Sequence, residues 1–528
     1  MNYIKKLHIE GFKKFDKIDI NFNEDKNIII GENESGKSTI LEAINIVLNQ
    51  KYKNSDKSFL KDLFNKNLIT NFEKDPKISN LPKIIIELEL DLDISNTHRI
   101  DFFGQDNLEK KEKYGITFKC EFNPEFSTDL SFLIADGKIP FEYYNLSWIA
   151  FSGNTYSMLK KPLNFIFIDT SKSDATSSFN YYNKALFSNT YDINTRMMAR
   201  NNFRDELESI INNKLNLTDI DTKRRFGIDT KKVILESVIN VIEDNIPLEN
   251  KGSGMENLIK TEIALTKRDK SKIDVILIEE PENHLSYSNM QIMIDKIANE
   301  NNSQIIITTH NDMIASKLEL KNIMWIKENE ITKFNKLTKE TSLFFQKANT
   351  NNLLHFILSK KIILVEGPTE FMLIPKFYEQ INLTSIEKDG ISIISCNGIS
   401  YKRYIEIANS LKKKVAILTD NDTNQSKIDK IENFNKENTN VKIFTDSDKN
   451  EWTLEVCLYH KNKNIFDNII KVDNDSNYLI KNGINPETKV LGWMLNNKTE
   501  CAYQILNDTE NTYAIPDYIK KAIKWVKE

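Results

Sequence analysis

Cysteine is scarce in this chain. Its 528 residues contain four cysteines, Cys120, Cys396, Cys457 and Cys501, which are far apart and form no Cys-x-x-Cys pair. Paired cysteines at short spacing are the usual sign of a structural zinc site, and disulfide frameworks belong to oxidising compartments. The pattern therefore argues against a zinc module and fits a reducing cytosol.

Long apolar runs are lacking as well. The N-terminal stretch MNYIKKLHIEGFKKF alternates apolar and polar residues, as a half-buried strand does. A membrane-spanning helix needs about 20 consecutive, mostly apolar residues, and no stretch approaches that length. We expect a cytoplasmic protein with no membrane segment.

The chain has no surplus of positive charge. With 72 Lys and Arg against 76 Asp and Glu, its formal net charge is -4. Overall charge thus gives no attraction to nucleic acid, so binding to a polyanion must depend on local basic patches or on metal ions that bridge carboxylates to phosphate. The hydrophobic content of 40% is ample for two or three domains with cores of their own.

The first half of the chain alternates strand and helix patterns. Residues 3–10 and 18–22 are typical of strands, and residues 27–48 combine a buried strand, a loop and an amphipathic helix. Residues 81–150 contain alternating segments that predict an antiparallel meander. Residues 175–245 are polar and helical, with RNNFRDELESIINNKL as the clearest amphipathic run. We interpret them as an inserted helical arm.

The second half returns to an α/β pattern. A strand, turn and helix order resumes at residue 272, and a new α/β segment begins near residue 360. Residues 335–358 are the expected junction. We find no internal repeat.

The stretch GENESGKS, residues 31–38, fits the phosphate-binding pattern G-x-x-x-x-G-K-S between a predicted strand and a predicted helix. Backbone amides at the helix start can face the phosphates, the lysine reaches the β and γ phosphates, and the serine can ligate Mg²⁺. An ordinary glycine-rich turn is the less favoured interpretation. The predicted ATP-binding residues here are Gly31, Asn33, Gly36, Lys37, Ser38 and Thr39.

Two acids end an aliphatic strand downstream. In DVILIEEPENHL, Glu279 and Glu280 follow the strand, where they can hold Mg²⁺ and polarise the attacking water. We predict Glu279 as a cofactor ligand and Glu280 as a catalytic residue. The stretch SQIIITTHND ends a further strand at His310, which we predict to sense the γ phosphate, although a lone histidine at a strand end is more often structural.

Gly252, Ser253 and Gly254 form a short turn that opens a predicted helix. They could offer backbone and hydroxyl donors to a nucleotide phosphate on a neighbouring subunit. With these elements in this order, residues 1 to about 335 resemble the ABC-type ATPase heads of the RecF and SMC group. Two positions differ from the group's usual pattern: Glu279 stands where Asp is usual, and KGSGM stands in place of Ser-Gly-Gly-Gln.

A second set of acids follows two later strands. ILVEGPTE places Glu366 and Glu370 around a Gly-Pro turn, and AILTDND places Asp420 and Asp422 after another aliphatic strand. An acid in a first helical turn is often no more than a helix-end preference. Two acid-tipped strands of one parallel sheet, however, bring four carboxylates to one edge, and such a cluster repels itself unless divalent cations neutralise it. The sequence predicts a Mg²⁺ or Mn²⁺ site.

Glu-Gly-x-x-Glu followed by Asp-x-Asp resembles the TOPRIM domain of topoisomerases, primases and a family of nucleases. Behind an ABC-type head, it resembles the OLD (overcoming lysogenization defect) family of ATPase-nucleases over nearly the whole chain. The resemblance implies an α/β fold in two domains. An ABC-type P-loop ATPase head at residues 1–340 carries the helical dimerisation insert at about 175–245, and a TOPRIM Rossmann-like domain with C-terminal helices follows at 355–528.

The resemblance also implies how the acids are used. Two metal ions would act at the TOPRIM site, with Glu455 as a further ligand and Glu451 as its less favoured neighbour. Glu370, Asp422 and Lys498 are placed for proton transfer or charge stabilisation, with no choice among them, and a surface lysine is the plain alternative for Lys498. The metal ligands implied across both sites are Ser38, Glu279, Glu366, Glu370, Asp420, Asp422 and Glu455.

Asn397 and Gly398 form either a tight turn at the metal edge or a simple strand-ending turn. The implied activity is a metal-dependent DNA endonuclease or nickase coupled to ATP, acting in defence against phage. The implied partners are DNA, further copies of the chain in a homodimer or higher homo-oligomer, and either a helicase, as in Gabija-type systems, or the reverse transcriptase and DNA of a retron.

Two alternatives stay open at this stage. A head-type ATPase could clamp DNA without cutting it, but a clamp has no need of four convergent carboxylates. A topoisomerase or primase would need a catalytic tyrosine domain or a zinc module, and the cysteine count excludes the zinc module. The amphipathic insert needs a partner for its apolar face, which predicts self-association.

Overall fold

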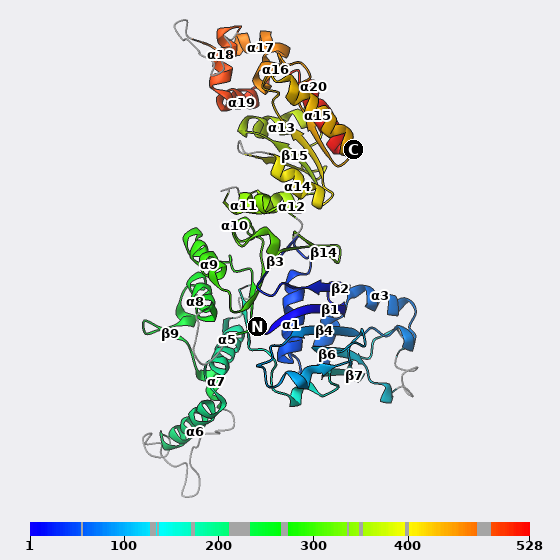
Figure 1. Cartoon of the computed structure of the whole chain (residues 1–528), viewed down its shortest axis with the longest axis vertical. Helices are drawn as coiled ribbons and strands as arrows, with labels where there is room; N and C mark the ends of the chain where they lie inside the picture. Colours follow the sequence, from blue (N-terminus) through cyan, green and yellow to red (C-terminus); the bar gives the residue numbers. More distant parts are fainter. Residues whose placement is uncertain are drawn as a thin grey trace. The chain divides into compact units, whose positions relative to one another are not determined.

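The chain forms two compact units, drawn in Figure 1. The computed structural model describes residues 1–53, 56–126, 134, 137–170, 175–210, 233–265, 273–334, 337–347, 352–396, 401–472 and 487–528, with the backbone alone at 175–181. One unit contains residues 1–318 and 322–333, and the other contains residues 319–321 and 334–528. Each unit has its own buried apolar core.

The first unit opens with an antiparallel sheet in the order β2-β1-β4-β6-β5, with β7 also paired to β6. This arrangement confirms the predicted meander. Its inward positions are Ile, Leu and Phe, and the alternate positions are polar, as expected for a sheet with one covered face. The strands are β1 (Tyr3–Phe12), β2 (Phe15–Asn21), β4 (Ile84–Asp91), β5 (Phe103–Gly104), β6 (Lys113–Phe122) and β7 (Tyr144–Ala150).

A second sheet in this unit carries the phosphate-binding loop. Its order is β14-β13-β3-β12-β11-β8, parallel except for β14. Helix α1 (Lys37–Asn49) follows β3 and contacts both sheets. The strands are β3 (Lys26–Gly31), β8 (Phe165–Asp169), β11 (Val275–Glu279), β12 (Gln304–Thr308), β13 (Ile323–Lys327) and β14 (Glu330–Lys333).

Helices surround this second sheet and form the inserted arm. In the arm, α5 packs against β8, and α6 has no buried residue. The predicted amphipathic run begins in α6, and its end lies outside the described residues. The helices of the unit are α2 (Leu60–Leu63), α3 (Lys66–Lys74), α5 (Ala175–Thr190), α6 (Ile193–Ser209), α7 (Leu235–Val238), α8 (Ser253–Leu265), α9 (Tyr287–Asn299) and α10 (Asp312–Lys317).

The second unit is built on a parallel sheet in the order β16-β15-β17-β18. Its strands are β15 (Lys361–Val365), β16 (Ile391–Ser395), β17 (Lys414–Leu418) and β18 (Val441–Phe444). β15 and β17, the two acid-tipped strands, belong to one parallel sheet, as the sequence predicts, and the structure shows that they are direct neighbours in it. Helix α20 packs on β15 and β17, and α13 packs on α19.

The helices of the second unit are α11 (Lys339–Lys347), α12 (Leu353–Leu358), α13 (Pro368–Asn382), α14 (Lys402–Ser410), α15 (Gln425–Glu437), α16 (Leu454–Lys461), α17 (Lys463–Ile469), α18 (Lys489–Asn496), α19 (Lys498–Asn507) and α20 (Asp517–Lys527). None of the helices in the described part of the chain combines the length and the apolar character that a membrane span requires.

Candidate active sites

The phosphate-binding loop joins β3 to α1, as predicted. Gly36 has φ 104, a left-handed conformation that glycine adopts at low cost. A Cβ at this position would lie 2.4 Å from the Phe15 ring, so both the backbone angle and the neighbouring ring require glycine. The loop is therefore shaped by its own sequence and by the first sheet.

Lys37 is 5% exposed and lies inside this loop. Its ammonium donates hydrogen bonds of 3.0 Å to the backbone oxygens of Gly31 and Glu32. Burial lowers the pKa of Lys37 to about 8, against the opposing pull of Glu280, Glu282 and Glu279. The lysine is thus enclosed and surrounded by acids, ready for an anionic ligand that can replace its two carbonyl partners.

Glu279 and Glu280 end β11, and β12 lies between that strand and β3. The Glu280 backbone has φ 44, and its amide donates to the Thr308 carbonyl oxygen at 2.9 Å. This turn directs the side chain toward the next loop, where Glu280 Oε1 lies 3.2 Å from His310 Nε2. The structure therefore brings together Lys37, Glu280 and His310.

Glu282 is a neighbour that the sequence interpretation missed. Its Oε1 accepts hydrogen bonds from the Thr309 hydroxyl at 2.8 Å and from the His310 amide at 2.7 Å. Its Oε2 is buried without a hydrogen-bond partner, and burial raises the pKa of the carboxyl. The signal was available in EEPEN, where a third acid follows the pair, but the direction of its side chain depends on the turn.

Gly252 directly precedes α8, and Ser253 and Gly254 are the first two residues of that helix. A Cβ on Gly254 would lie 2.1 Å from the backbone oxygen of His284, so the helix start packs directly against the loop that follows β11. The predicted contact of Gly252, Ser253 and Gly254 with a nucleotide on a neighbouring subunit stays a prediction.

A second acid cluster lies at the C-terminal edge of the β15–β17 pair. Glu366 follows β15 and accepts a hydrogen bond from the Thr419 hydroxyl, which follows β17. Glu370 lies in the first turn of α13, where its Oε2 accepts a hydrogen bond of 3.1 Å from the Gly367 amide. The helix-end explanation of Glu370 is thus correct for one of its oxygens.

Asp420 lies at the centre of this cluster. Its Oδ1 accepts a hydrogen bond of 3.2 Å from the Leu454 amide at the start of α16. Burial, together with the negative charges of Glu455 and Glu370, raises the pKa of the Asp420 carboxyl to about 8, against the opposing effect of Lys498. Burial, together with Glu455 and Glu366, also raises the pKa of Glu370.

Glu455 and Lys498 complete the cluster from α16 and α19. Glu455 is 2% exposed, and its Oε2 lies 2.8 Å from Lys498 Nζ. Thr453 donates to the same Glu455 oxygen and lies 3.2 Å from the lysine. The ion pair raises the pKa of Lys498 against the opposing effect of desolvation, although the lysine side chain is 44% exposed. The implied third acid and late lysine are therefore in contact.

Asp422 is the one predicted acid of this domain that does not join the cluster. The Asp422 backbone has φ 54, and its side chain is 66% exposed and lies 2.7 Å from Lys427 Nζ. The intervening Asn421 is fully buried, and its amide lies within hydrogen-bond distance of three backbone oxygens in residues 446–451. Asp422 thus lies beside the acid cluster rather than in it. Asn397 and Gly398 lie outside the described residues.

The acids lie close together without forming a finished ligand set. Within the described residues, no three His, Cys, Asp or Glu side chains are arranged to hold one ion. The donor chemistry nevertheless fits Mg²⁺ or Mn²⁺, because hard divalent cations prefer carboxylate oxygens and Asp420 is enclosed among like charges. Glu366, Glu370, Asp420 and Glu455 are the residues that could hold the ions.

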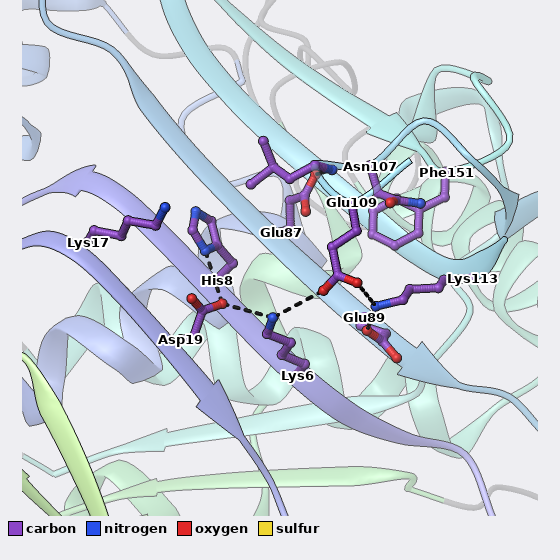
Figure 2. A pocket seen from close by; sticks show the side chains of 11 residues that line it. Lys6, His8, Lys17, Asp19, Glu87, Glu89, Asn107, Glu109, Lys113 and Phe151 are labelled. Carbon is purple, nitrogen blue, oxygen red and sulfur yellow. Dashed lines mark hydrogen bonds and ion pairs between the residues drawn. The ribbon is translucent and has the colours of Figure 1, made fainter. Parts of the chain in front are cut away.

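A third charged group lines a cavity of about 280 Å³ on the polar face of the first sheet (Figure 2). Lys6 Nζ lies 3.0 Å from Asp19 and 3.4 Å from Glu109, and Lys113 Nζ lies 3.1 Å from Glu109. His8 Nδ1 lies 3.1 Å from the same Asp19. Because opposite charges pair with one another here, this cavity offers less net charge to a ligand than either acid cluster.

Two families match the chain. Residues 2–315 match the family described as AAA ATPase domain, and residues 357–422 match the family described as Overcoming lysogenization defect protein-like, TOPRIM domain. The first match includes the phosphate-binding loop and His310. The second includes Glu366, ends at Asp422 and so stops before Glu455.

Among known proteins, the chain is similar to two proteins named Endonuclease GajA from Bacillus cereus. It is 22% identical to that of strain VD045, over 80% of this chain and 75% of the relative, and 24% identical to that of strain HuB5-5, over 80% and 76%. It is also 27% identical to the Old nuclease of Escherichia phage P2, over 38% of this chain and 33% of the relative.

Solved structures with similarity include an SMC head domain from Thermotoga maritima, with 15% identity, coverage of 62% of this chain and 98% of that chain, and a TM-score of 0.31. A RecF–ATP structure has 13% identity, coverage of 63% and 99%, and a TM-score of 0.35. The ATPase-domain match covers more than half of the chain, and the TOPRIM match follows it. The chain therefore belongs to the AAA ATPase-domain family and, with its OLD-like TOPRIM domain, to the OLD family of ATPase-nucleases.

Proposed function

We propose that this protein is a metal-dependent DNA endonuclease or nickase, regulated by ATP binding or hydrolysis, that acts in defence against phage. The first compact unit is then the ATPase domain and the second the nuclease domain. The curated relatives named Endonuclease GajA and Old nuclease support a nuclease, and the two family matches support an ATPase joined to a TOPRIM domain.

One observation carries the nuclease proposal. Asp420 lies among Glu366, Glu370 and Glu455, and its pKa is raised to about 8 by burial and by like charge. Such an arrangement is unfavourable for folding alone, because a neutral residue at this position avoids both penalties. Acids kept under these conditions are typical of a functional site.

The acids would act on a phosphodiester bond as follows. The chemistry that bound Mg²⁺ or Mn²⁺ would supply is activation of a water molecule and neutralisation of charge on the phosphate and the leaving oxygen. Glu366, Asp420 and Glu455 would hold the ions. Lys498 stays protonated beside Glu455, because the ion pair raises its pKa, so its ammonium can stabilise a developing negative charge.

The ATPase residues divide their work in a similar way. Lys37 would exchange its two carbonyl partners for the β and γ phosphates, and Ser38 at the start of α1 and Glu279 at the end of β11 would hold Mg²⁺. Glu280 would orient the attacking water, with His310 at 3.2 Å beside it. A cavity of about 730 Å³ lies next to Glu34 of the loop, with Lys13 and Lys14 in its lining.

The test of the nuclease proposal uses supercoiled plasmid. Wild type and Asp420→Ala are compared with Mg²⁺, with Mn²⁺ and with EDTA, and ATP hydrolysis is followed in parallel. Wild type should cut with either metal, EDTA should stop it, and Asp420→Ala should lose about 10³-fold or more in rate while it still hydrolyses ATP. Asp429→Ala, on the exposed face of α15, is the matched control.

One result would overturn the proposal, and another would correct the expected independence of the two domains. Cleavage by Asp420→Ala at the wild-type rate would make the acids structural caps and favour a DNA clamp. Loss of both activities would show that the two domains are coupled more tightly than separate sheets suggest.

We also propose that the arm makes the protein a homodimer or a higher oligomer. Helix α6 has no buried residue, and Ile193, Met197 and Met198 are 60%, 58% and 66% exposed. Side chains of this kind favour burial against a partner. The triple change to Ser should lower the mass measured by light scattering, and an unchanged mass would refute the arm as the contact.

A companion of this chain is proposed by its class alone. DNA is the substrate, and a helicase or the reverse transcriptase and DNA of a retron are the candidate companions. Co-purification from cells that express the neighbouring genes identifies which of the two is bound, because either complex would enrich one defined protein with this chain.

A further inference from the structure

A groove lies beside the acid cluster in the second unit, between α14 and α15. It has a volume of about 590 Å³, within the range of small-ligand sites. Ile405 and Phe434 give it an apolar lining, and Tyr401 stands at one end. Lys402, Lys427 and Lys430 supply the positive charge around it.

The groove reaches Asp422, the exposed acid beside the cluster. Lys427 lines it and lies 2.7 Å from Asp422, two residues beyond Asp420. Tyr401, which directly precedes α14, lines the groove as well. A ligand in the groove would therefore place its next phosphate beside Asp422.

The lining selects the class of ligand. Lysines bind the phosphates of a nucleic-acid strand, and aromatic and apolar side chains accept the face of a base whatever its sequence. A base can lie on Phe434 or Tyr401 only when it is out of the duplex stack. A purely structural gap between two helices needs no lysines around it.

Resting on the proposed nuclease function, we propose that the groove between α14 and α15 binds one unpaired nucleotide of the DNA strand, next to the phosphodiester that is cut. The base lies on Phe434 and Tyr401, and the phosphate lies between Lys427 and Lys430. A phosphate on Lys427 competes with Asp422 for the same ammonium, so binding of the strand loosens the ion pair that holds Asp422 outside the acid cluster.

The binding test uses full-length protein in EDTA, so that no strand is cut. The probes are a fluorescent oligothymidylate, a blunt duplex, and a duplex with one bulged nucleotide. Wild type should bind the single strand and the bulged duplex at least about fivefold more tightly than the blunt duplex, because a blunt duplex must first give up a stacked base. Equal affinity for the three probes would overturn the proposal.

Two variants test the lining. Lys430→Gln removes one phosphate partner and should reduce the slope of log K against log salt by about 0.7 on the single strand. Phe434→Leu keeps an apolar side chain but removes the aromatic face, and it should weaken binding about fivefold or more with a smaller effect on the salt slope. Lys436→Gln, also exposed on α15 but outside the groove lining, is the matched control.

A spectroscopic readout separates stacking from altered folding. With 2-aminopurine as the bulged base, the fluorescence of the probe should change when wild type binds. Binding of the Phe434→Leu variant should not produce the same change. Thermal unfolding of each variant checks that the domain is intact.

The outcomes also separate this proposal from the nuclease proposal. If Asp420→Ala is inactive while Lys430→Gln and Phe434→Leu bind and cut as wild type does, the nuclease stands and the groove proposal fails. If wild type cuts no substrate yet shows the predicted preference for unpaired DNA, the groove stands as a DNA-binding site and the nuclease fails.

Discussion

Each unit places a lysine among acids, and the two lysines behave in opposite ways. Lys37 donates to two backbone carbonyls, and burial lowers its pKa to about 8. Lys498 contacts a buried carboxylate directly, and that contact raises its pKa. In the second unit, the ion pair changes the lysine pKa more than burial does. In the first unit, burial changes it more than the more distant carboxylates do.

The difference matches two kinds of site. The surroundings of Lys37 are complete without a side-chain partner, which leaves its charge available to a substrate that comes and goes. Lys498 is part of the resting structure, since it neutralises Glu455 inside the domain. Backbone carbonyls thus hold the lysine of the first unit, and a buried carboxylate holds the lysine of the second.

The largest effect is expected at Lys37. Lys37→Ala should reduce ATP hydrolysis by about 10³-fold, because the phosphates lose a fixed cation in the site. The fold should survive, since water can satisfy the two carbonyls that the lysine leaves. Phosphate release and thermal unfolding measure both effects, with the exposed Lys53→Ala as control. Hydrolysis at the wild-type level would contradict the assignment of this loop as phosphate-binding.

Glu280 and Glu282 allow a sharper comparison inside the ATPase unit. Glu280→Gln should keep ATP binding and lose about 10²-fold in turnover, because an amide cannot act as a base. Glu282→Gln should have a smaller effect, because its amide oxygen can still accept hydrogen bonds from Thr309 and the His310 amide. Single-turnover hydrolysis and nucleotide titration separate the two steps. Equal rates for the two variants would show that Glu280 is not the water-orienting acid.

The sequence predicted the parts of both sites that depend on strand ends. Aliphatic runs that end in Glu279, Glu366 and Asp420 form parallel strands, and parallel strands place their carboxyl ends on one edge. The Glu-Gly-x-x-Glu and Asp-x-Asp patterns predicted that β15 and β17 share one parallel sheet, and the structure adds that they are neighbours in it. The insertion of β12 between β3 and β11 could not be read from periodicity, since strand order depends on long-range packing.

The sequence did not predict the directions of side chains in loops. Asp422 is turned toward Lys427 by a left-handed backbone at φ 54, and Glu282 is turned toward His310 by the loop after β11. These choices depend on a few backbone angles that no spacing rule encodes. Glu370 shows the reverse case, because one carboxylate both caps a helix and belongs to the acid cluster.

The free energy of unfolding gives the next test of the contrast between Lys37 and Lys498. Lys498→Ala leaves Glu455 buried without its cation, and should cost about 1–3 kcal/mol of unfolding free energy, a range reduced by the partial exposure of the lysine. Lys37→Ala should cost less. The double variant Lys498→Ala with Glu455→Gln should recover much of the loss, and Lys521→Ala, exposed on α20, is the control. Urea unfolding measures all four, and equal losses for Lys37→Ala and Lys498→Ala would remove the distinction.

The last effect is expected from Asp420, as a dependence of stability on pH. The pKa of its carboxyl is about 8 in the folded protein and near 4 in an unfolded chain. A raised folded pKa gives a contribution to stability that is fully present below about pH 4 and is lost as pH rises through about 8. Asp420→Asn removes this titration. In EDTA, the unfolding temperature of the variant relative to wild type should therefore increase between about pH 5 and 8, by about 2–4 °C for each kcal/mol that wild type loses.

Mg²⁺ should then raise the unfolding temperature of wild type more than that of the variant, because a bound cation relieves the repulsion that the variant lacks. Asp429→Asn, exposed on α15, should keep a constant difference from wild type at every pH. A constant difference for Asp420→Asn as well would show that Asp420 is ionised without penalty and that the acid cluster is not strained in the absence of metal.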